Sequence, residues 1–155
     1  MRLKGPWPIE TVEGFLREAT IPIRLAVASA LDVPLVLSLW FLWQRPAIWC
    51  ATKDAARVVA LLRRRPACGF EIAADSPPYR GVRGQGVAAL VKAQGPVVLK
   101  RLLERYGVAP QSRLTQTLTK HPDIEMAIRI EPTWITSWDY SDRMSDAFRV
   151  TVADA

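Results

Sequence analysis

The chain has 155 residues, of which half are hydrophobic and 23% are charged, and its formal net charge is +6. This length and composition fit a single globular domain and exclude a disordered chain. The basic residues are scattered except at 63–65 and no nucleic-acid motif surrounds them, so we expect no nucleic-acid partner. The N-terminus lacks a signal-peptide core, and the most apolar stretch, residues 33–43, is much shorter than the ~20 residues of a membrane-spanning helix. We therefore expect a cytoplasmic protein with no membrane partner.

The first third of the chain predicts one helix and three strands. Thr11 is the expected N-cap of a short helix. Strands are expected at residues 23–29, 35–43 and 47–51, with a hairpin between the first two. The strand at 35–43 is apolar on both faces, so we expect one face to fill a barrel and the other to meet a helix, a partner subunit or a cofactor. The hairpin turn is expected at Leu31-Asp32-Val33-Pro34.

The middle third predicts a helix and a long pair of strands. Residues 54–65 carry a buried apolar stripe, and three arginines fall in the last turn, where cations suit the helix dipole. Strands at 67–74 and 82–91 follow, joined by a rigid turn at 75–81. The second of these strands contains two glycines, which mark a place where a barrel bends or a cofactor approaches.

The last third predicts two helices and two strands. Gly95 opens the first helix and Gly107 ends it, and residues 112–120 form the second. A strand at 123–131 alternates apolar and charged residues, and a last strand at 133–139 follows a break at the intervening proline.

The expected total is about seven strands and three or four helices. Several strands are joined by short turns, whereas a parallel α/β fold needs helices between successive strands. The sequence therefore predicts a mainly β fold, an antiparallel barrel with helices inserted at its edge. We expect one domain over residues 1–155, with a core at about 11–143 and a C-terminal tail at 144–155.

Two cysteines and one histidine leave little material for a metal centre or a histidine-based triad. Cys50 and Cys68 lie in apolar stretches and are expected to be small core residues. His121 precedes a proline and is expected in a loop. No spacing resembles a zinc site, so no metal is expected. A catalytic Cys–His pair and ligation of a haem by His121 remain alternatives. No catalytic residue is assigned.

The order of the elements carries a family resemblance. Its motifs are Pro34–Trp43, Ile48–Thr52, the helix end Leu61–Pro66, Pro77–Gly84 with Gly86, Ile130–Thr133 and Ser137–Asp139. In this order they resemble the pyridoxamine 5′-phosphate oxidase-like split-barrel superfamily, which includes flavin- and deazaflavin-dependent oxidoreductases. The resemblance covers roughly residues 11–143 and implies a six- to seven-stranded antiparallel split barrel, homodimeric, with cofactor sites at the subunit interface. FMN is the usual ligand of the superfamily, while some branches use the 8-hydroxy-5-deazaflavin coenzyme and a few bind haem.

The resemblance also implies where a cofactor would be held. The edge of the strand at 35–43 would supply backbone contacts to the flavin ring from Leu37, Ser38, Leu39 and Trp40. The third strand and the helix after it would hold the cofactor phosphate through Thr52, Lys53 and Arg57. Residues near the rigid turn and the C-terminal strand would reach a neighbouring cofactor, cap the pocket or pack near the ring, namely Arg80, Arg83 and Trp138.

Physical chemistry supports this phosphate site only in part. A helix N-terminus favours a phosphate, and Arg57 can add a bidentate contact. Relatives commonly carry a serine, a basic residue and a lysine where this chain has Ala56, Arg57 and Val58. Two phosphate ligands are therefore missing, with Lys53 as a substitute. This departure leaves room for the deazaflavin coenzyme, for haem or for no cofactor.

The resulting hypothesis is a flavin- or deazaflavin-dependent oxidoreductase that acts on an unidentified small-molecule substrate, with the cofactor carrying the electrons or hydride. Pyridoxamine phosphate oxidation itself is not expected, because the C-terminal part lacks the arginine and histidine motif for the substrate phosphate. A Rossmann dinucleotide site is not expected either, since no Gly-x-Gly-x-x-Gly is present. The alternatives are a non-catalytic flavin- or haem-binding protein and a split barrel that has lost its cofactor.

Overall fold

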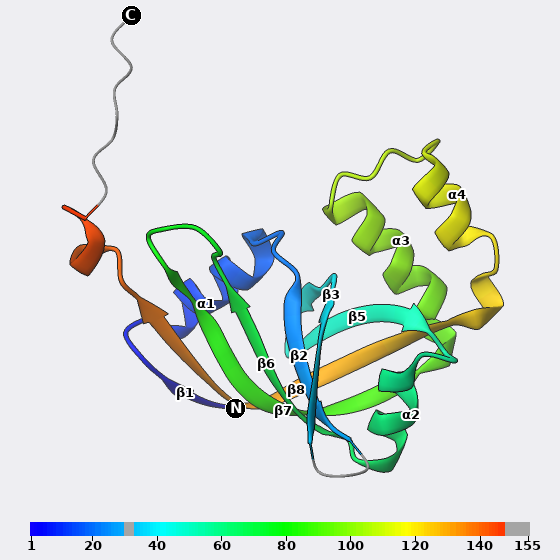
Figure 1. Cartoon of the computed structure of the whole chain (residues 1–155), viewed down its shortest axis with the longest axis horizontal. Coiled ribbons are helices and arrows are strands. Elements are labelled where there is room, and N and C mark those ends of the chain that lie inside the picture. The colour runs from blue at the N-terminus through cyan, green and yellow to red at the C-terminus, as the bar shows by residue number, and fades with distance from the viewer. Residues whose placement is uncertain (30–32, 148–155) are drawn as a thin grey trace, which may run out of the picture.

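The computed structural model describes residues 1–29 and 33–147, and its strands form one strongly curved sheet (Figure 1). The strands are β1 (Arg2–Lys4), β2 (Ile23–Ala28), β3 (Pro34–Leu39), β4 (Leu42–Gln44), β5 (Ala47–Lys53), β6 (Ala67–Ala73), β7 (Arg80–Val91) and β8 (Glu125–Asp139). The α-helices are α1 (Ile9–Glu18), α2 (Arg57–Arg64), α3 (Gly95–Arg105) and α4 (Arg113–Thr119). Three short 3₁₀ helices complete the described part, η1 (Lys92–Gln94), η2 (Pro122–Ile124) and η3 (Asp142–Met144).

The sheet is an open barrel. Its strands run in the order β3-β2-β6-β7-β8-β5-β4 with antiparallel neighbours, and β1 adds one parallel pairing to β8. Among the described strands, β3 and β4 end this path without pairing to each other. The prediction of a mainly β, antiparallel barrel with inserted helices is confirmed.

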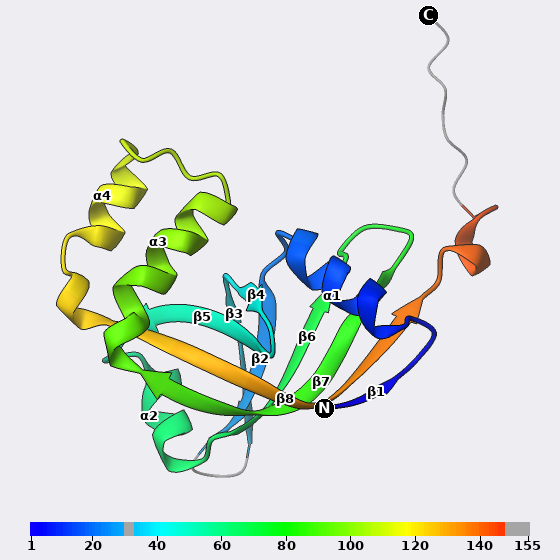
Figure 2. The same cartoon turned by 180° about the vertical axis from the view of Figure 1, so that it is seen from behind.

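Two apolar clusters hold the sheet and helices together. The larger one fills the concave side, where α1 packs (Figure 2) and buries Val12 and Leu16 completely. The smaller one lies under α3 on the opposite face of β5 and β8, and it includes Leu102 and Ala127. Since side chains alternate along a strand, β8 supplies both clusters.

β8 runs through the proline that was expected to break it. Pro132 pairs with Gly86, and the ladder to β7 shifts register between Gln85 and Gly86. The shift leaves Thr133 without an opposite residue, and its hydroxyl donates to the Gln85 carbonyl at 3.1 Å. Proline lacks a backbone donor and is tolerated at such bulges. The prediction of two strands was therefore wrong, and Gly86 of β7 lies at the irregularity opposite the proline.

The apolar run expected as one strand at 35–43 is instead two strands. β3 ends at Leu39 and β4 begins at Leu42. Between them the Phe41 N–H leaves the sheet and donates to the Tyr106 hydroxyl at 3.2 Å. This side chain comes from the end of α3, so a contact remote in sequence makes the break.

Two helices begin elsewhere than expected. α1 starts at Ile9, because the Pro8 carbonyl already accepts from the Val12 N–H at 3.1 Å, so Thr11 lies inside the helix. α2 starts at Arg57, because the Asp54 N–H still donates to the Ile124 carbonyl of the segment beside it, 2.8 Å away. No helix in residues 1–29 and 33–147 is long and apolar enough to cross a membrane.

Some predicted features fall partly outside the described residues. β2 and β3 form the expected antiparallel hairpin, but residues 30–32 of its turn lie outside the described part. The same holds for residues 148–155 of the expected tail. Cys50 and Cys68 are free and buried, as predicted, and burial raises the pKa of the Cys68 thiol to about 11.

Candidate functional site

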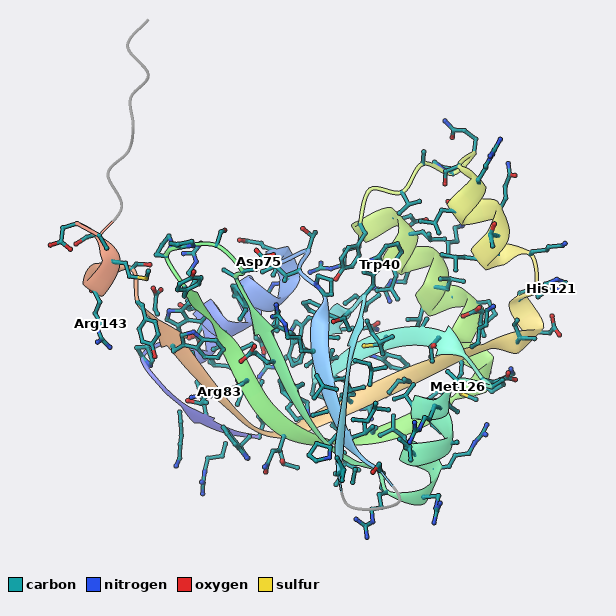
Figure 3. The ribbon with its side chains drawn as sticks, viewed as in Figure 1. Trp40, Asp75, Arg83, His121, Met126 and Arg143 are labelled. Atoms are coloured by element: carbon teal, nitrogen blue, oxygen red, sulfur yellow. The ribbon has the colours of Figure 1, made fainter. Side chains whose placement is uncertain are left out.

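A cavity of about 600 Å³ opens between the β3 edge, β5 and α3. Its walls are mainly apolar. Figure 3 places Trp40 beside α3, where β3 ends. The lining residues are Pro22, Ser38, Leu39, Trp40, Ala51, Thr52, Lys53, Ala55, Ala56, Leu99, Leu102, Leu118 and Glu125. We call this cavity the main pocket.

The main pocket gathers half of the residues expected to hold a cofactor. Five of them line it, namely Ser38, Leu39, Trp40, Thr52 and Lys53. Leu37 does not line it and packs against the larger apolar cluster instead. Arg57 is exposed at the first residue of α2, directly after the lining residue Ala56.

The edge position of β3 makes its backbone accessible. In the ladder, β3 pairs with β2 on one side, and no described strand pairs with its other side. Alternate N–H and C=O groups on that outer edge therefore have no strand partner. A flat ligand in the main pocket can accept and donate hydrogen bonds along this edge.

Trp40 is held in place by the end of α3. Its ring stacks on Tyr106 with centroids 4.8 Å apart and planes 16° from parallel. The Tyr106 hydroxyl donates to the Ile21 carbonyl and accepts from the Phe41 N–H, both at 3.2 Å. Burial raises the pKa of this phenol. Tyr106 therefore stacks on the Trp40 ring and also bonds to the backbone of Ile21 and Phe41, so it holds the Trp40 ring in place.

The cationic end of the main pocket lies where β5 meets α2. Lys53 is exposed at the end of β5. The neighbouring Asp54 is neutralised by Lys92, whose ammonium lies 2.5 Å from its carboxylate and holds the pKa of that carboxyl below its usual range. Val58 is only 3% exposed and packs in the core, so this position of α2 offers no side chain to the main pocket.

Glu125 is the charged residue of the main pocket that the sequence did not identify as a site residue. It is the first residue of β8, lies directly opposite Lys53 in the ladder, and is only 4% exposed. Burial raises the pKa of its carboxyl. The alternating pattern placed it with Arg129 and Glu131 on one face of the strand, but α3 covers that face only at its start. No pattern in the sequence indicates that α3 packs over the start of this strand.

Three other expected site residues lie away from the main pocket. Arg80 and Arg83 are exposed on β7, and the Arg83 guanidinium lies 5.2 Å from the centroid of the Trp138 ring. Figure 3 shows Arg83 and Trp40 in different parts of the molecule. Within one chain the structure therefore does not bring Arg80, Arg83 and Trp138 to the same site as the β3 edge.

The described residues contain no metal-ligand cluster of three or more His, Cys, Asp or Glu side chains. His121 is exposed just before η2, in a loop as expected, and it does not line the main pocket. Figure 3 shows it beyond α4. The main pocket thus offers a ligand an apolar wall, a backbone edge, a lysine and a buried carboxyl.

Comparison with known proteins supports the fold. No protein-family model matches the sequence, and no curated protein matches it. A conserved hypothetical protein from Mycobacterium tuberculosis superposes with a TM-score of 0.77 at 21% identity, covering 97% of this chain and 96% of the other. An F420 reductase gives 0.68 at 19% identity, covering 84% and 97%. The heme storage protein HutZ from Vibrio cholerae gives 0.61 at 19% identity, covering 85% and 91%. At these identities the likeness establishes a common fold.

Proposed function

Because the chain has the pyridoxamine 5′-phosphate oxidase-like split-barrel fold, we propose that it is a flavin- or deazaflavin-dependent oxidoreductase acting on a small molecule. A fold hosts many functions, so the proposal depends on the site. The observation that carries it is that the main pocket gathers five expected cofactor-binding residues in one cavity of about 600 Å³. Small-molecule sites typically measure ~300–1,000 Å³.

The residues present fit the ring of such a cofactor. Leu39, Trp40 and the α3 leucines form an apolar wall that suits a flat aromatic system. The outer edge of β3 offers backbone groups to the polar edge of a ring. When bound, the cofactor would supply the hydride or electron transfer. The chain's own residues would bind it, orient it and keep water from its apolar face.

The residues also fit a phosphate, with fewer ligands than a full set. Lys53 and Thr52 line the main pocket, and Arg57 stands at the start of α2, where backbone N–H groups are free. Asp54 would repel a phosphate, but the Lys92 ammonium paired with it at 2.5 Å offsets that repulsion. FMN is the first ligand to test, followed by the deazaflavin coenzyme.

An absorbance titration of the purified protein with FMN, the deazaflavin coenzyme and haemin tests the proposal. We expect saturable binding of a flavin-type cofactor, and Lys53→Ala or Arg57→Ala to weaken it by about tenfold each, or ~1.4 kcal/mol. Lys100→Ala is the matched control, because this exposed α3 lysine does not line the main pocket. Absence of saturable binding by all three ligands would overturn the proposal.

A binding protein without turnover is the second candidate. One neighbour of the same fold is named a heme storage protein. In this chain His121 lies outside the main pocket, so the pocket itself offers no histidine to a haem iron. Binding of haemin alone would favour this candidate. Substrate-dependent oxidation of a pre-reduced flavin-type cofactor would favour the oxidoreductase.

We extend the proposal to a homodimer. A groove of about 460 Å³ crosses β2, β6 and β7; Val87 lines it and is 48% exposed, and Val36, which pairs with the lining residue Ala26, is 61% exposed. Exposed apolar side chains beside a groove are the kind of surface on which a second copy can pack. We expect light scattering to give about twice the 17.3 kDa of one chain, and Val87→Glu to give a monomer. A monomeric wild-type protein at micromolar concentration would contradict this prediction.

A further inference from the structure

Glu125 is a buried carboxyl that the fold leaves without a partner. Its side chain lines the main pocket and is only 4% exposed. Among the described residues, no hydrogen bond or ion pair reaches its carboxyl, which faces the space of the main pocket. Because this carboxyl opens to the main pocket and has no protein partner there, a ligand can form a hydrogen bond with it.

Charged groups surround this carboxyl from two sides. Lys53 faces it across the β5–β8 ladder and makes no ion pair with another described residue. Lys92 of η1 and Asp54 after β5 also act on it, but they pair with each other at 2.5 Å. α3 packs over it with Gly95 against the Glu125 backbone, and the α3 and α4 residues that line the main pocket are leucines.

The balance of these groups raises the pKa of the Glu125 carboxyl, which makes its protonated form easier to reach. Burial is the largest influence and raises the pKa of Glu125, and Asp54 acts in the same direction. Lys53 and Lys92 oppose the shift without cancelling it. A carboxyl in this state is a hydrogen-bond donor, whereas an ionised one only accepts.

The position of Glu125 matches the gap in the expected phosphate site. Ala56 offers no polar side-chain atom, and Val58 is in the core. The groups available near Lys53 on the pocket wall are therefore Thr52 and Glu125. A phosphate placed beside Lys53 would lie beside the Glu125 carboxyl as well, since the two residues are opposite each other on the same face of the sheet.

We propose that Glu125 binds the phosphate end of the ligand as a neutral acid, so that binding takes up a proton. The acid O–H donates to a phosphate oxygen, and the Lys53 ammonium balances the phosphate charge. Once ionised, the same carboxyl repels the phosphate. This inference rests on the proposed function, because it assumes that a phosphate-bearing flavin-type cofactor occupies the main pocket.

The proposal has a quantitative consequence. A phosphate dianion beside the acid raises its pKa further, so the complex holds the proton at a pH where the free protein has lost it. Between those two pKa values affinity falls by up to about tenfold per pH unit. A glutamine at this position donates an amide N–H at every pH and cannot repel the phosphate, so this dependence disappears.

Titration with FMN and riboflavin from about pH 5 to about pH 8 tests the proposal. Across this pH range we expect the FMN affinity of the wild type to fall by about tenfold or more in excess of the fall measured for Glu125→Gln. At the upper end Glu125→Gln binds FMN more tightly than the wild type. Riboflavin lacks the phosphate, so the two proteins show the same pH profile with it. Glu131→Gln is the control, because this exposed residue on the same strand pairs with Arg129.

Calorimetry in two buffers of different ionisation enthalpy gives a second readout. We expect the wild type to take up more protons on binding FMN than on binding riboflavin. This measurement decides the question even if Glu125→Gln fails to fold. Equal pH profiles for wild type and Glu125→Gln, or equal proton uptake with the two ligands, would overturn the inference while FMN still binds. Failure of FMN, riboflavin and the deazaflavin coenzyme to bind the wild type would overturn the proposed function, and the inference with it.

Discussion

Gly95→Ala is expected to destabilise the protein by about 3 kcal/mol and to abolish ligand binding in the main pocket. A Cβ at this position would lie 2.5 Å from the Glu125 carbonyl carbon and 2.9 Å from the Met126 nitrogen. Both atoms belong to the backbone of β8, so no side-chain rotation relieves the clash. α3 has to move away from the sheet, and it carries Leu99 and Leu102 in the wall of the main pocket. Urea unfolding and the FMN titration measure the two effects.

Gly14→Ala is the matched control for this substitution. Gly14 lies inside α1, and a Cβ there would meet nothing within 4 Å. Alanine in a helix interior is favoured over glycine by ~0.5–1 kcal/mol, so this variant is expected to be more stable than the wild type. The prediction for Gly95 fails if both alanine variants change the free energy of unfolding in the same direction.

Arg105→Ala is expected to lower the free energy of unfolding by about 2–4 kcal/mol. The Arg105 guanidinium donates to three carbonyls at the end of α1, those of Leu16, Arg17 and Ala19. It also lies 5.2 Å from the centroid of the Phe41 ring. A cation at a helix C-terminus satisfies free carbonyls and complements the helix dipole. Without it, α1 loses its attachment to α3 and Phe41 loses a packing partner.

Arg101→Ala tests whether the effect is specific to this contact. Arg101 lies one turn earlier on α3, is exposed and bonds only to the Gln44 side chain, at 2.7 Å. We expect it to change the stability by less than ~0.5 kcal/mol. Urea denaturation of the three proteins gives the comparison. Equal midpoints for Arg105→Ala and Arg101→Ala would show that the α1 carbonyls are satisfied by water instead.

The local parts of the fold were predictable from the residues. α4 begins after Ser112, whose hydroxyl accepts from the Thr115 N–H at 3.1 Å, and Gly107 adopts a positive φ of 66° after α3. The period of two in β8 and the apolar stripe of α2 are also local patterns. Each depends on the geometry of a few consecutive residues, which the sequence displays directly.

The candidate site was predictable in part. The resemblance pointed to Ser38, Leu39, Trp40, Thr52 and Lys53, and the structure brings all five to one cavity. It also pointed to Leu37, which packs against the larger core cluster, and to residues on β7 and β8 that one chain does not bring to the cavity. A motif identifies a position along the chain, whereas the direction of each side chain depends on which face the neighbouring elements cover.

What the sequence by itself determined is therefore most of the helices and strands, the antiparallel barrel and the strands that border the main pocket. Only the tertiary structure decided that Gly86 faces Pro132 and keeps β8 continuous, that Tyr106 divides β3 from β4, and that α3 buries Glu125 beside Lys53. The physical reason is the distance along the chain between the residues that interact. Periodicity and capping arise between residues a few positions apart, whereas these three contacts join segments that only the folded sheet brings together. The proton-linked role proposed for Glu125 also depends on such a long-range contact. Packing against α3 buries this residue and leaves its carboxyl facing the main pocket without a protein partner.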